Sequence, residues 1–457
     1  MNNLFVIDST LAQQHHDYTL SSIKSSKRSN ENSNANIGHV YSLNDKNDQT
    51  IFNGYSLHNV DEDLINLIRS RPEVDHIETD SIVNTQEIYH GLDDGKVYDA
   101  DVITQKNAPW GLARISHHDP LSLSTFNKYV YDTHGGEGVN VYVVDTGINI
   151  HHVEFEGRAH WGKTIPLNDV DEDGNGHGSH CAGTIASRKY GVAKKANVIA
   201  VKVLGSNGSG TMSDVIGGVI WAAQDAKKKY AESIHEFKTK GSTSHKGSVA
   251  NMSLGGGKSP TLDRAVNKAV ESGLSFAVAA GNDNENACNS SPASAPKAVT
   301  VGASTLWDER AYFSNTGECV DIFAPGLNIL SVWNSGPHSI NTISGTSMAS
   351  PHTAGTLAYL LSLNYDKYNN VINDNDNILN RIYKSSLNVF FDSFGINLSS
   401  MLSPIFKPNA PLPPNIPEPI SPAFLKNSLL SLAGRDYLTD VSYGSPNLLL
   451  FNNATSI

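Results

Sequence analysis

The chain has 457 residues, a length that favours two domains over one and allows a large buried core. Its formal net charge is −12 and no Lys- or Arg-rich block stands out, so the composition argues against a nucleic-acid partner. The longest apolar runs are too short to span a membrane, and 3 cysteines are too few for a disulfide-based scaffold.

Residues 1–83 have the pattern of a small α+β domain. The stretches "NLFVID", "HVYSL", "TIFNGYSL" and "VDHIETDSIV" are typical of strands, and two amphipathic stretches between them are typical of helices. Ser9 and Asp61 are the candidate N-caps of these helices, and Pro72 ends the second one. The order β-α-β-β-α-β predicts a ferredoxin-like fold.

Residues 84–107 are polar with little periodicity, which predicts a linker. From about Trp110 to residue 364, short apolar strands alternate with helical stretches. Near-continuous apolar strands between helices predict an α/β domain, a mostly parallel sheet with helices on both faces. Residues 365–457 form an extension that is first Asn/Asp-rich and then Pro-rich, and "SPNLLLFNN" within it predicts a final strand.

Three local motifs lie where parallel strands end or helices begin, which is where sites of open α/β sheets gather. Asp145 ends the apolar run "VYVVD", and by itself it is more typical of a turn-forming cap. His177 lies between two glycines, three residues before His180, so a loop histidine and a metal-binding pair are both open. Ser347 opens a buried helix, where a serine commonly serves as a cap.

Together these motifs indicate more than each does alone. A nucleophilic serine needs an imidazole that takes its proton and a buried carboxylate that holds the imidazole in one tautomer. It also needs donors for the developing oxyanion, and Asn282 follows another apolar strand, in "AVAAGN". The order Asp145, His177, Asn282, Ser347 therefore favours nucleophilic catalysis.

The motifs "VVDTG", "GNGHGSHCAGT", "NMSLGGG", "AAGN" and "SGTSMASPH" resemble those of subtilisin-like serine proteases. The resemblance covers about residues 108–363, and "HCAG" is typical of the proteinase K-like branch. Stretches such as "APWGLARIS", "HWGKTIPLND" and "ANMSLGGGKSP" resemble most its cerevisin-like fungal members. Residues 1–83 resemble the inhibitory propeptide of this family, most strongly in "RSRPEVDHIETDSIV".

The resemblance implies a role for each of four residues. Ser347 would be the nucleophile, and His177 the general base and then the general acid. Asp145 would orient His177, and Asn282 would donate a hydrogen bond to the oxyanion.

Two glycine-rich segments match those that bind substrate backbone as an added strand in this family. They are Gly208, Ser209 and Gly210, and Ser253, Leu254, Gly255 and Gly256. Glycine suits this task because the ligand backbone must approach closely, although plain turn chemistry would also account for these glycines.

The same comparison makes His180 a structural residue and Cys181 a buried thiol. It favours a disulfide between Cys288 and Cys319 in an oxidising lumen, with two free thiols as the alternative. Asp321 matches a calcium-binding position of relatives, but one carboxylate is a poor signal, so we assign no metal and expect no cofactor.

The sequence thus predicts a serine endopeptidase made as a zymogen, with its own propeptide as an intramolecular inhibitor. We expect self-cleavage between Val83 and Asn107, protein and peptide substrates, and a monomer. The neutral segments "SNGSGTM" and "SLGGG" favour broad specificity. The alternatives are a kexin-like processing protease, which needs acidic pockets, and a catalytically silent binding protein with this fold.

The resemblance favours the vacuole lumen, with secretion or the spore wall as alternatives, although the N-terminus lacks the pattern of a secretory signal. We expect a glycoprotein. Of the N-glycosylation sequons, Asn207 and Asn251 fall in the predicted cleft, and the better acceptors are Asn397, Asn453 and Asn289.

Overall fold

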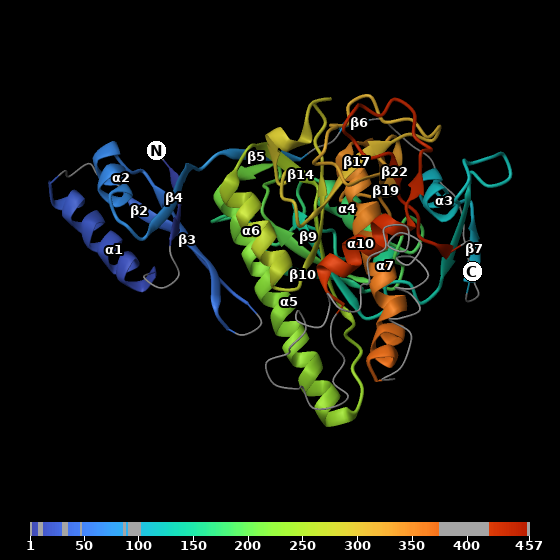
Figure 1. Cartoon of the computed structure of the whole chain (residues 1–457), viewed down its shortest axis with the longest axis horizontal. Helices are drawn as coiled ribbons and strands as arrows, with labels where there is room; N and C mark the ends of the chain where they lie inside the picture. The colour runs from blue at the N-terminus through green and yellow to red at the C-terminus, as the bar shows by residue number, and fades with distance from the viewer. Residues whose placement is uncertain are drawn as a thin grey trace, which may run out of the picture.

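The structure is a computed structural model that describes residues 2–7, 12–29, 35–45, 48–85, 88–89, 102–373 and 420–454 (Figure 1). The candidate cap Ser9, the sequon at Asn397 and most of the Pro-rich stretch lie outside the described residues.

The N-terminal domain has the predicted ferredoxin-like order. Its elements are β1 (Asn3–Ile7), α1 (Ala12–Ser29), β2 (Asn36–Asn44), β3 (Thr50–His58), α2 (Glu62–Arg69) and β4 (Val74–Thr79). The four strands form an antiparallel sheet in the order β2-β3-β1-β4. Asp61 caps α2 by accepting a hydrogen bond from the backbone of Leu64, and Leu64, Ile65 and Ile68 are buried, as the pattern predicts.

A 9-stranded sheet in the order β10-β11-β9-β13-β15-β17-β18-β22-β21 forms the centre of the larger domain. Its strands are β9 (Val139–Asp145), β10 (Ala159–Thr164), β11 (Asn197–Lys202), β13 (Gly247–Met252), β15 (Ser275–Ala279), β17 (Val299–Ser304), β18 (Ile322–Pro325), β21 (Gly434–Arg435) and β22 (Leu448–Leu449). All neighbouring pairs are parallel except β21 with β22, which confirms the mostly parallel sheet.

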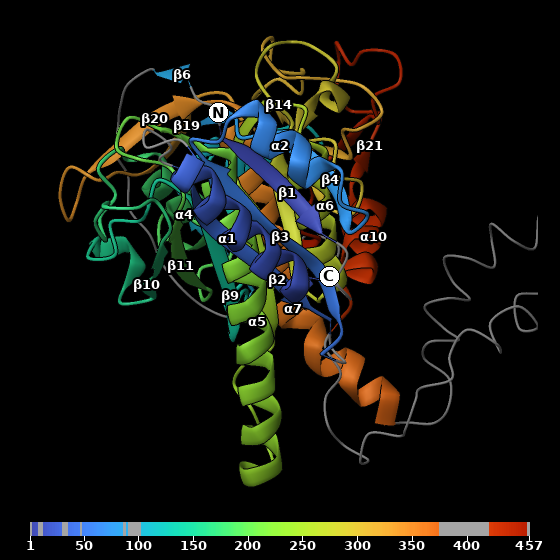
Figure 2. The same cartoon turned by 90° about the vertical axis from the view of Figure 1, so that its left-hand side faces the viewer.

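Helices cover both faces of this sheet, as the apolar strands predict. α4 (His177–Ala186) and α7 (Thr346–Asn373) pack on one face, and α5 (Met212–Lys240) and α6 (Pro260–Glu271) on the other (Figures 1 and 2). Side chains of β9 alternate between the two cores, with Val143 in the first and Val144 in the second. No helix within the described ranges is long and apolar enough to cross a membrane.

Shorter elements complete the described structure. They are β5 (Ile82–Thr85), β6 (Ile88–Tyr89), β7 (Val102–Lys106), α3 (Trp110–Ser116), β8 (Lys128–Asp132), η1 (Val153–Phe155), β12 (Ser209–Thr211), β14 (Leu254–Gly257), η2 (Ala287–Asn289), β16 (Ser290–Ser291), β19 (Ile329–Val332), β20 (Ile340–Ser344) and α10 (Pro422–Leu432).

The strand order creates a topological switch point at β9. The chain leaves β9 to form β10 and β11 on one side of it and later returns to place β13 on the other side. In open α/β sheets such a reversal opens a crevice outside the carboxyl end of the strand. Asp145 is the last residue of β9, so the topology places it at this crevice.

Two boundaries differ from those expected from the sequence. Val102–Lys106, within the expected linker, forms β7 and pairs with β8, and alternate residues Ile103 and Gln105 are buried. Residues 420–454, within the expected extension, fold onto the larger domain and supply β22 to its sheet. Both segments acquire strand structure by pairing with distant residues, which local periodicity does not reveal.

Besides His177, which begins α4, each of the helices α4 and α7 carries one further buried histidine. His180 hydrogen-bonds through Nε2 to Ile329 O at 2.9 Å, and His352 through Nδ1 to Met348 O at 2.7 Å. Burial lowers the pKa of His180 to about 3 and that of His352 to about 4, from 6.5. Both side chains are therefore neutral in the folded protein, and His180 has the structural role expected of it.

These histidines predict a loss of stability in acid. Between pH 6.5 and about 4, these two histidines bind protons in the unfolded chain but stay neutral in the folded chain. The free energy of unfolding therefore falls as the pH falls. Each histidine adds a slope of about 1.4 kcal/mol per pH unit. The variant His352→Asn keeps a donor near Nδ1 but does not titrate. Urea unfolding is measured at several pH values with and without His352→Asn, in chains that carry Ser347→Ala so that they do not digest themselves. The slope of stability against pH should be smaller by that amount in the His352→Asn chain. Equal slopes in both chains would contradict the assignment of His352 as neutral in the folded protein.

Candidate active site

Asp145 and His177 meet at the crevice beside β9. Both side chains are fully buried, and His177 Nδ1 lies 2.6 Å from Asp145 Oδ1. The backbone of Thr146 donates to the same carboxylate oxygen at 2.8 Å, so the carboxylate is held in place. An ionised carboxylate only accepts, hence Nδ1 carries the proton and Nε2 is the acceptor nitrogen of the ring.

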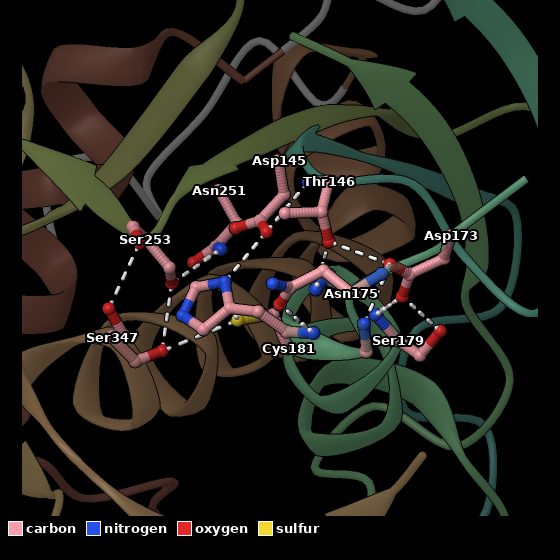
Figure 3. A network of polar contacts seen from close by, with 12 residues as sticks. Asp145, Thr146, Asp173, Asn175, Ser179, Cys181, Asn251, Ser253 and Ser347 are labelled. Carbon is pink, nitrogen blue, oxygen red and sulfur yellow. Dashed lines mark hydrogen bonds and ion pairs between the residues drawn. The ribbon is translucent and has the colours of Figure 1, made fainter. Parts of the chain in front are cut away.

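A second buried carboxylate, Asp173, fixes the start of α4. It accepts five hydrogen bonds at 2.5–3.1 Å, from Thr146 Oγ1, the backbone N–H groups of Asn175, Gly176 and Ser179, and Ser179 Oγ (Figure 3). It thereby ties the end of β9 to the first turn of α4, from which His177 projects. Sequence reasoning did not single out Asp173, although an acidic residue before a glycine-rich turn and a helix is an N-terminus signal.

Ser347 lies in the first turn of α7, where Pro351 changes the backbone hydrogen bonding. Proline has no N–H, so it cannot donate to the carbonyl of the residue four positions earlier, which is Ser347. That carbonyl instead accepts from Ser253 Oγ at 2.8 Å and from Cys181 Sγ at 3.5 Å. Ser347 Oγ in turn donates to Ser253 O at 2.9 Å, and Figure 3 shows Ser253 and Ser347 facing each other.

Cys181 connects the two halves of the site. Its Sγ lies 4.0 Å from His177 Nδ1 as well as 3.5 Å from Ser347 O. The residue is fully buried, and burial raises the pKa of its thiol, so it stays protonated. Donor atoms of Asp145, His177 and Cys181 lie within 4.8 Å of one another, but a metal ligand must be a thiolate, which this burial disfavours.

Asn282 approaches the site from the loop after β15. Its Oδ1 accepts from the backbone N–H of Thr346 at 2.9 Å and from Thr346 Oγ1 at 2.8 Å. Because a backbone N–H can only donate, the end of the Asn282 amide that faces Thr346 must be its oxygen. The –NH₂ end of the side chain is then the end that can donate to another group.

The two glycine-rich segments flank a strand of the chain itself. In the sheet β12-β5-β14-β16, residues 82–85 lie antiparallel between Ser209–Thr211 and Leu254–Gly257. Thr85 N also donates to Gly208 O at 3.0 Å. Of the residues expected to bind backbone, Ser209 and Gly210 pair with 84 and 83, and Leu254 and Gly255 pair with 85 and 84.

This added strand fits closely. Val83 is fully buried in the core formed with Leu254 and Met212. A Cβ at Gly256 would lie 3.1 Å from Ile82 O, which is tighter than an ordinary contact. The close approach explains why glycine occupies this position.

Two carboxylates of the N-terminal domain cap helices of the larger domain. Asp80 accepts from the backbone and the hydroxyl of Ser213 at the start of α5, at 2.9 and 2.7 Å. Glu78 accepts from Thr261 N at the start of α6, at 3.1 Å. The positive end of a helix dipole favours such anions, so these contacts hold the N-terminal domain against α5 and α6 (Figure 2).

A pocket lies next to the loop that carries Asn282, with Gly281 and Asp283, the neighbours of Asn282, in its lining. Its lining is Gly255, Gly256, Ala279, Ala280, Gly281, Asp283, Ser290, Ser291 and Ala293. All of these side chains are small, and the one charged group among the lining residues, Asp283, is exposed to solvent. Sequence reasoning missed Asp283, because its adjacency to Asn282 alone does not reveal a pocket.

Cys288 and Cys319 form a disulfide with their Cα atoms 5.3 Å apart. Cys288 precedes Ser290, a residue of the pocket lining, by two positions, so the bond anchors the chain close to the pocket. Asn251, a sequon residue, is fully buried and hydrogen-bonds to Ser253 and Ser350. It is therefore inaccessible to a glycan in the folded protein.

The chain resembles known proteins over both of its domains. Residues 136–383 match the model of the subtilase family, and residues 7–86 match that of peptidase inhibitor I9. A subtilisin-like protease of Coccidioides posadasii is 54% identical over 403 residues, which cover 88% of this chain and 69% of that protein. Alkaline protease 2 of Aspergillus fumigatus is 53% identical over 403 residues, which again cover 88% of this chain and 69% of that protein.

Among solved structures, a cold-adapted subtilisin-like serine proteinase matches with a TM-score of 0.56 and 39% identity, covering 76% of this chain and 99% of that one. The family model alone spans more than half of the chain. The chain therefore belongs to the subtilase family of serine proteases and carries an I9-type inhibitor domain at its N-terminal side.

Proposed function

We propose that Asp145, His177 and Ser347 form the catalytic triad of this serine endopeptidase, and that Asn282 donates to the oxyanion. The observation that carries the proposal is the 2.6 Å contact between His177 and Asp145, joined through Cys181 to the first turn of α7. These contacts support the proposal that a carboxylate, an imidazole and a hydroxyl from three distant parts of the sequence act together in one crevice.

In the proposed mechanism, Ser347 Oγ attacks the scissile carbonyl while His177 Nε2 takes its proton. Asp145 stabilises the imidazolium that forms. Asn282 and the backbone N–H groups at the start of α7 stabilise the tetrahedral oxyanion. His177 then protonates the leaving amine, and water hydrolyses the acyl-enzyme by the reverse sequence of proton transfers.

We also propose that the chain is a zymogen that cleaves itself between Thr85 and Ile88. Residues 82–85 occupy the two backbone-binding segments, whereas Ile88–Tyr89 pair with β20, which ends three residues before Ser347. These two pairings support a cut in the interval between the two strands. The match to the inhibitor family ends at residue 86, within the same interval.

The pocket supports broad specificity over kexin-like processing. Recognition of paired basic residues needs several buried acidic groups, and the described lining contributes only the exposed Asp283. Retention of all four reaction residues likewise opposes the catalytically silent alternative.

For the compartment, we propose an oxidising lumen on the secretory route, because the Cys288–Cys319 disulfide persists under such conditions. The comparisons give no support to the vacuole lumen, so we favour the secreted alternative. Asn289 is exposed and lies outside the two backbone-binding segments, so we propose it as a glycan acceptor.

The role of Ser347 predicts that Ser347→Ala abolishes both peptide hydrolysis and propeptide removal. The corresponding loss in subtilisin, a member of this family, is about 10⁶-fold in turnover. Ser431→Ala, at an exposed helix position, is the matched control and should leave both intact. Normal processing of the Ser347→Ala chain in pure form would overturn the assignment.

The position of the inhibitory strand predicts the start of the mature enzyme. N-terminal sequencing of the processed protein should read Gln86, Glu87 or Ile88 as the first residue. The Ser347→Ala chain, sequenced alongside, should keep its original N-terminus. Any other first residue of the mature enzyme would contradict the proposed cleavage position.

The exposure of Asp283 predicts a small specificity effect. Asp283→Asn should lower kcat/KM for peptides with Lys at the cleaved position by no more than about fivefold, since exposed charge pairs contribute about 0.2–1 kcal/mol. Peptides with Leu there should be unaffected, and Glu285→Gln, outside the pocket lining, serves as control. A loss above about a hundredfold confined to basic substrates would favour the kexin-like alternative.

A further inference from the structure

Lys426, on α10, directs its ammonium group into a set of three oxygen atoms. Nζ lies 2.5 Å from Ala298 O, 3.2 Å from Pro296 O and 2.7 Å from Asp321 Oδ2. The side chains of Lys426 and Asp321 are 16% and 24% exposed, so the pair is mostly shielded from solvent. We call these three oxygen atoms the oxygen nest.

The oxygen nest has the chemistry of a cation site. Two backbone carbonyls and one carboxylate are the hard oxygen ligands that bind Ca²⁺ in proteins. Burial raises the pKa of Asp321, and the neighbouring Lys426 opposes that rise by stabilising the carboxylate. Removal of the ammonium would leave a shielded carboxylate and two carbonyl dipoles facing one another without a positive charge.

The oxygen nest also connects to the wall of the pocket. Asp321 Oδ2 accepts from Thr300 N at 2.8 Å, and Thr300 Oγ1 donates to Ala293 O at 2.7 Å. Ala293 and Ser291 line the pocket, and the loop that follows them supplies Pro296 O and Ala298 O. The charge in the nest therefore holds the loop that forms one side of the pocket.

We propose that Lys426 is a built-in cation, whose ammonium occupies a site that takes Ca²⁺ when the lysine is removed. The C-terminal segment, through α10, then supplies the positive charge that braces the pocket loop, and no dissociable metal is needed at this place. Lys426 is a positioning residue: it contacts neither the proposed triad nor the added strand.

The test compares thermal unfolding of full-length chains carrying Ser347→Ala, in chelator and in millimolar CaCl₂. Lys426→Ala should melt several degrees below the parent in chelator and should recover with rising Ca²⁺, because a ligand that binds only the folded state stabilises it. Lys228→Ala, which removes an exposed lysine of α5, should respond to Ca²⁺ as the parent does. Adding Asp321→Asn to Lys426→Ala should abolish the gained response.

Lys426→Asp serves as a second variant, because its carboxylate adds an oxygen ligand and should make folding still more dependent on Ca²⁺. If Lys426→Ala fails to fold in either buffer, Lys426→Asp decides the question. The proposal is overturned if neither variant gains a Ca²⁺ response over the parent, or if the parent has a Ca²⁺ response of the same size that Asp321→Asn removes.

An activity measurement gives a second readout that rests on the proposed function. In the active enzyme, Lys426→Ala should raise KM for peptide substrates in chelator more than it lowers kcat, and Ca²⁺ should restore KM. A melting response without this change in KM would retain the cation site but refute its coupling to the pocket. The melting test uses inactive chains, so it tests the cation site whether or not Ser347 is the nucleophile. The activity of Ser347→Ala tests the proposed triad whether or not Lys426 occupies a cation site.

Discussion

The hydrogen bond between Asp145 and His177 is the contact on which the proposed chemistry depends. It joins the carboxyl end of β9 to the first residue of α4, at the point where the strand order of the sheet reverses. The bond places the proton on Nδ1 and leaves Nε2 to accept a proton from a nucleophile. Asp173 protects this geometry, because its five hydrogen bonds tie together the backbone on both sides of the pair.

The bound inhibitory strand has the backbone geometry that we propose for a bound substrate. An extended segment completes the sheet between β12 and β14, and its hydrogen bonds are made by the main chain, so they tolerate many sequences. The inhibitor domain adds contacts that a short peptide lacks, namely Asp80 and Glu78 at the starts of α5 and α6. These contacts explain how a cleaved propeptide could remain bound after its last strand is cut from the rest of the chain.

Much of the fold could be predicted from the sequence, because the apolar strands, the helix signals and the turn residues are local patterns. Asp145, His177 and Ser347 lie in such local motifs, and the order of these motifs indicated their shared function. Residues whose role arises from distant partners could not be found in this way. Lys426 and Asp321 are 105 positions apart in the sequence, and neither stretch carries a pattern that points to the other. β7 was missed for the same reason, since its five residues become a strand only through pairing with β8.

The central claim is that Ser347 is activated by His177, and labelling by a fluorophosphonate probe tests it most directly. The probe reacts covalently only with an activated nucleophile. In the processed enzyme, peptide mapping should find the phosphonyl group on Ser347. His177→Ala, from which added active enzyme has removed the propeptide, should lose the labelling while remaining folded. Labelling at another residue, or undiminished labelling of Ser347 in His177→Ala, would contradict the account.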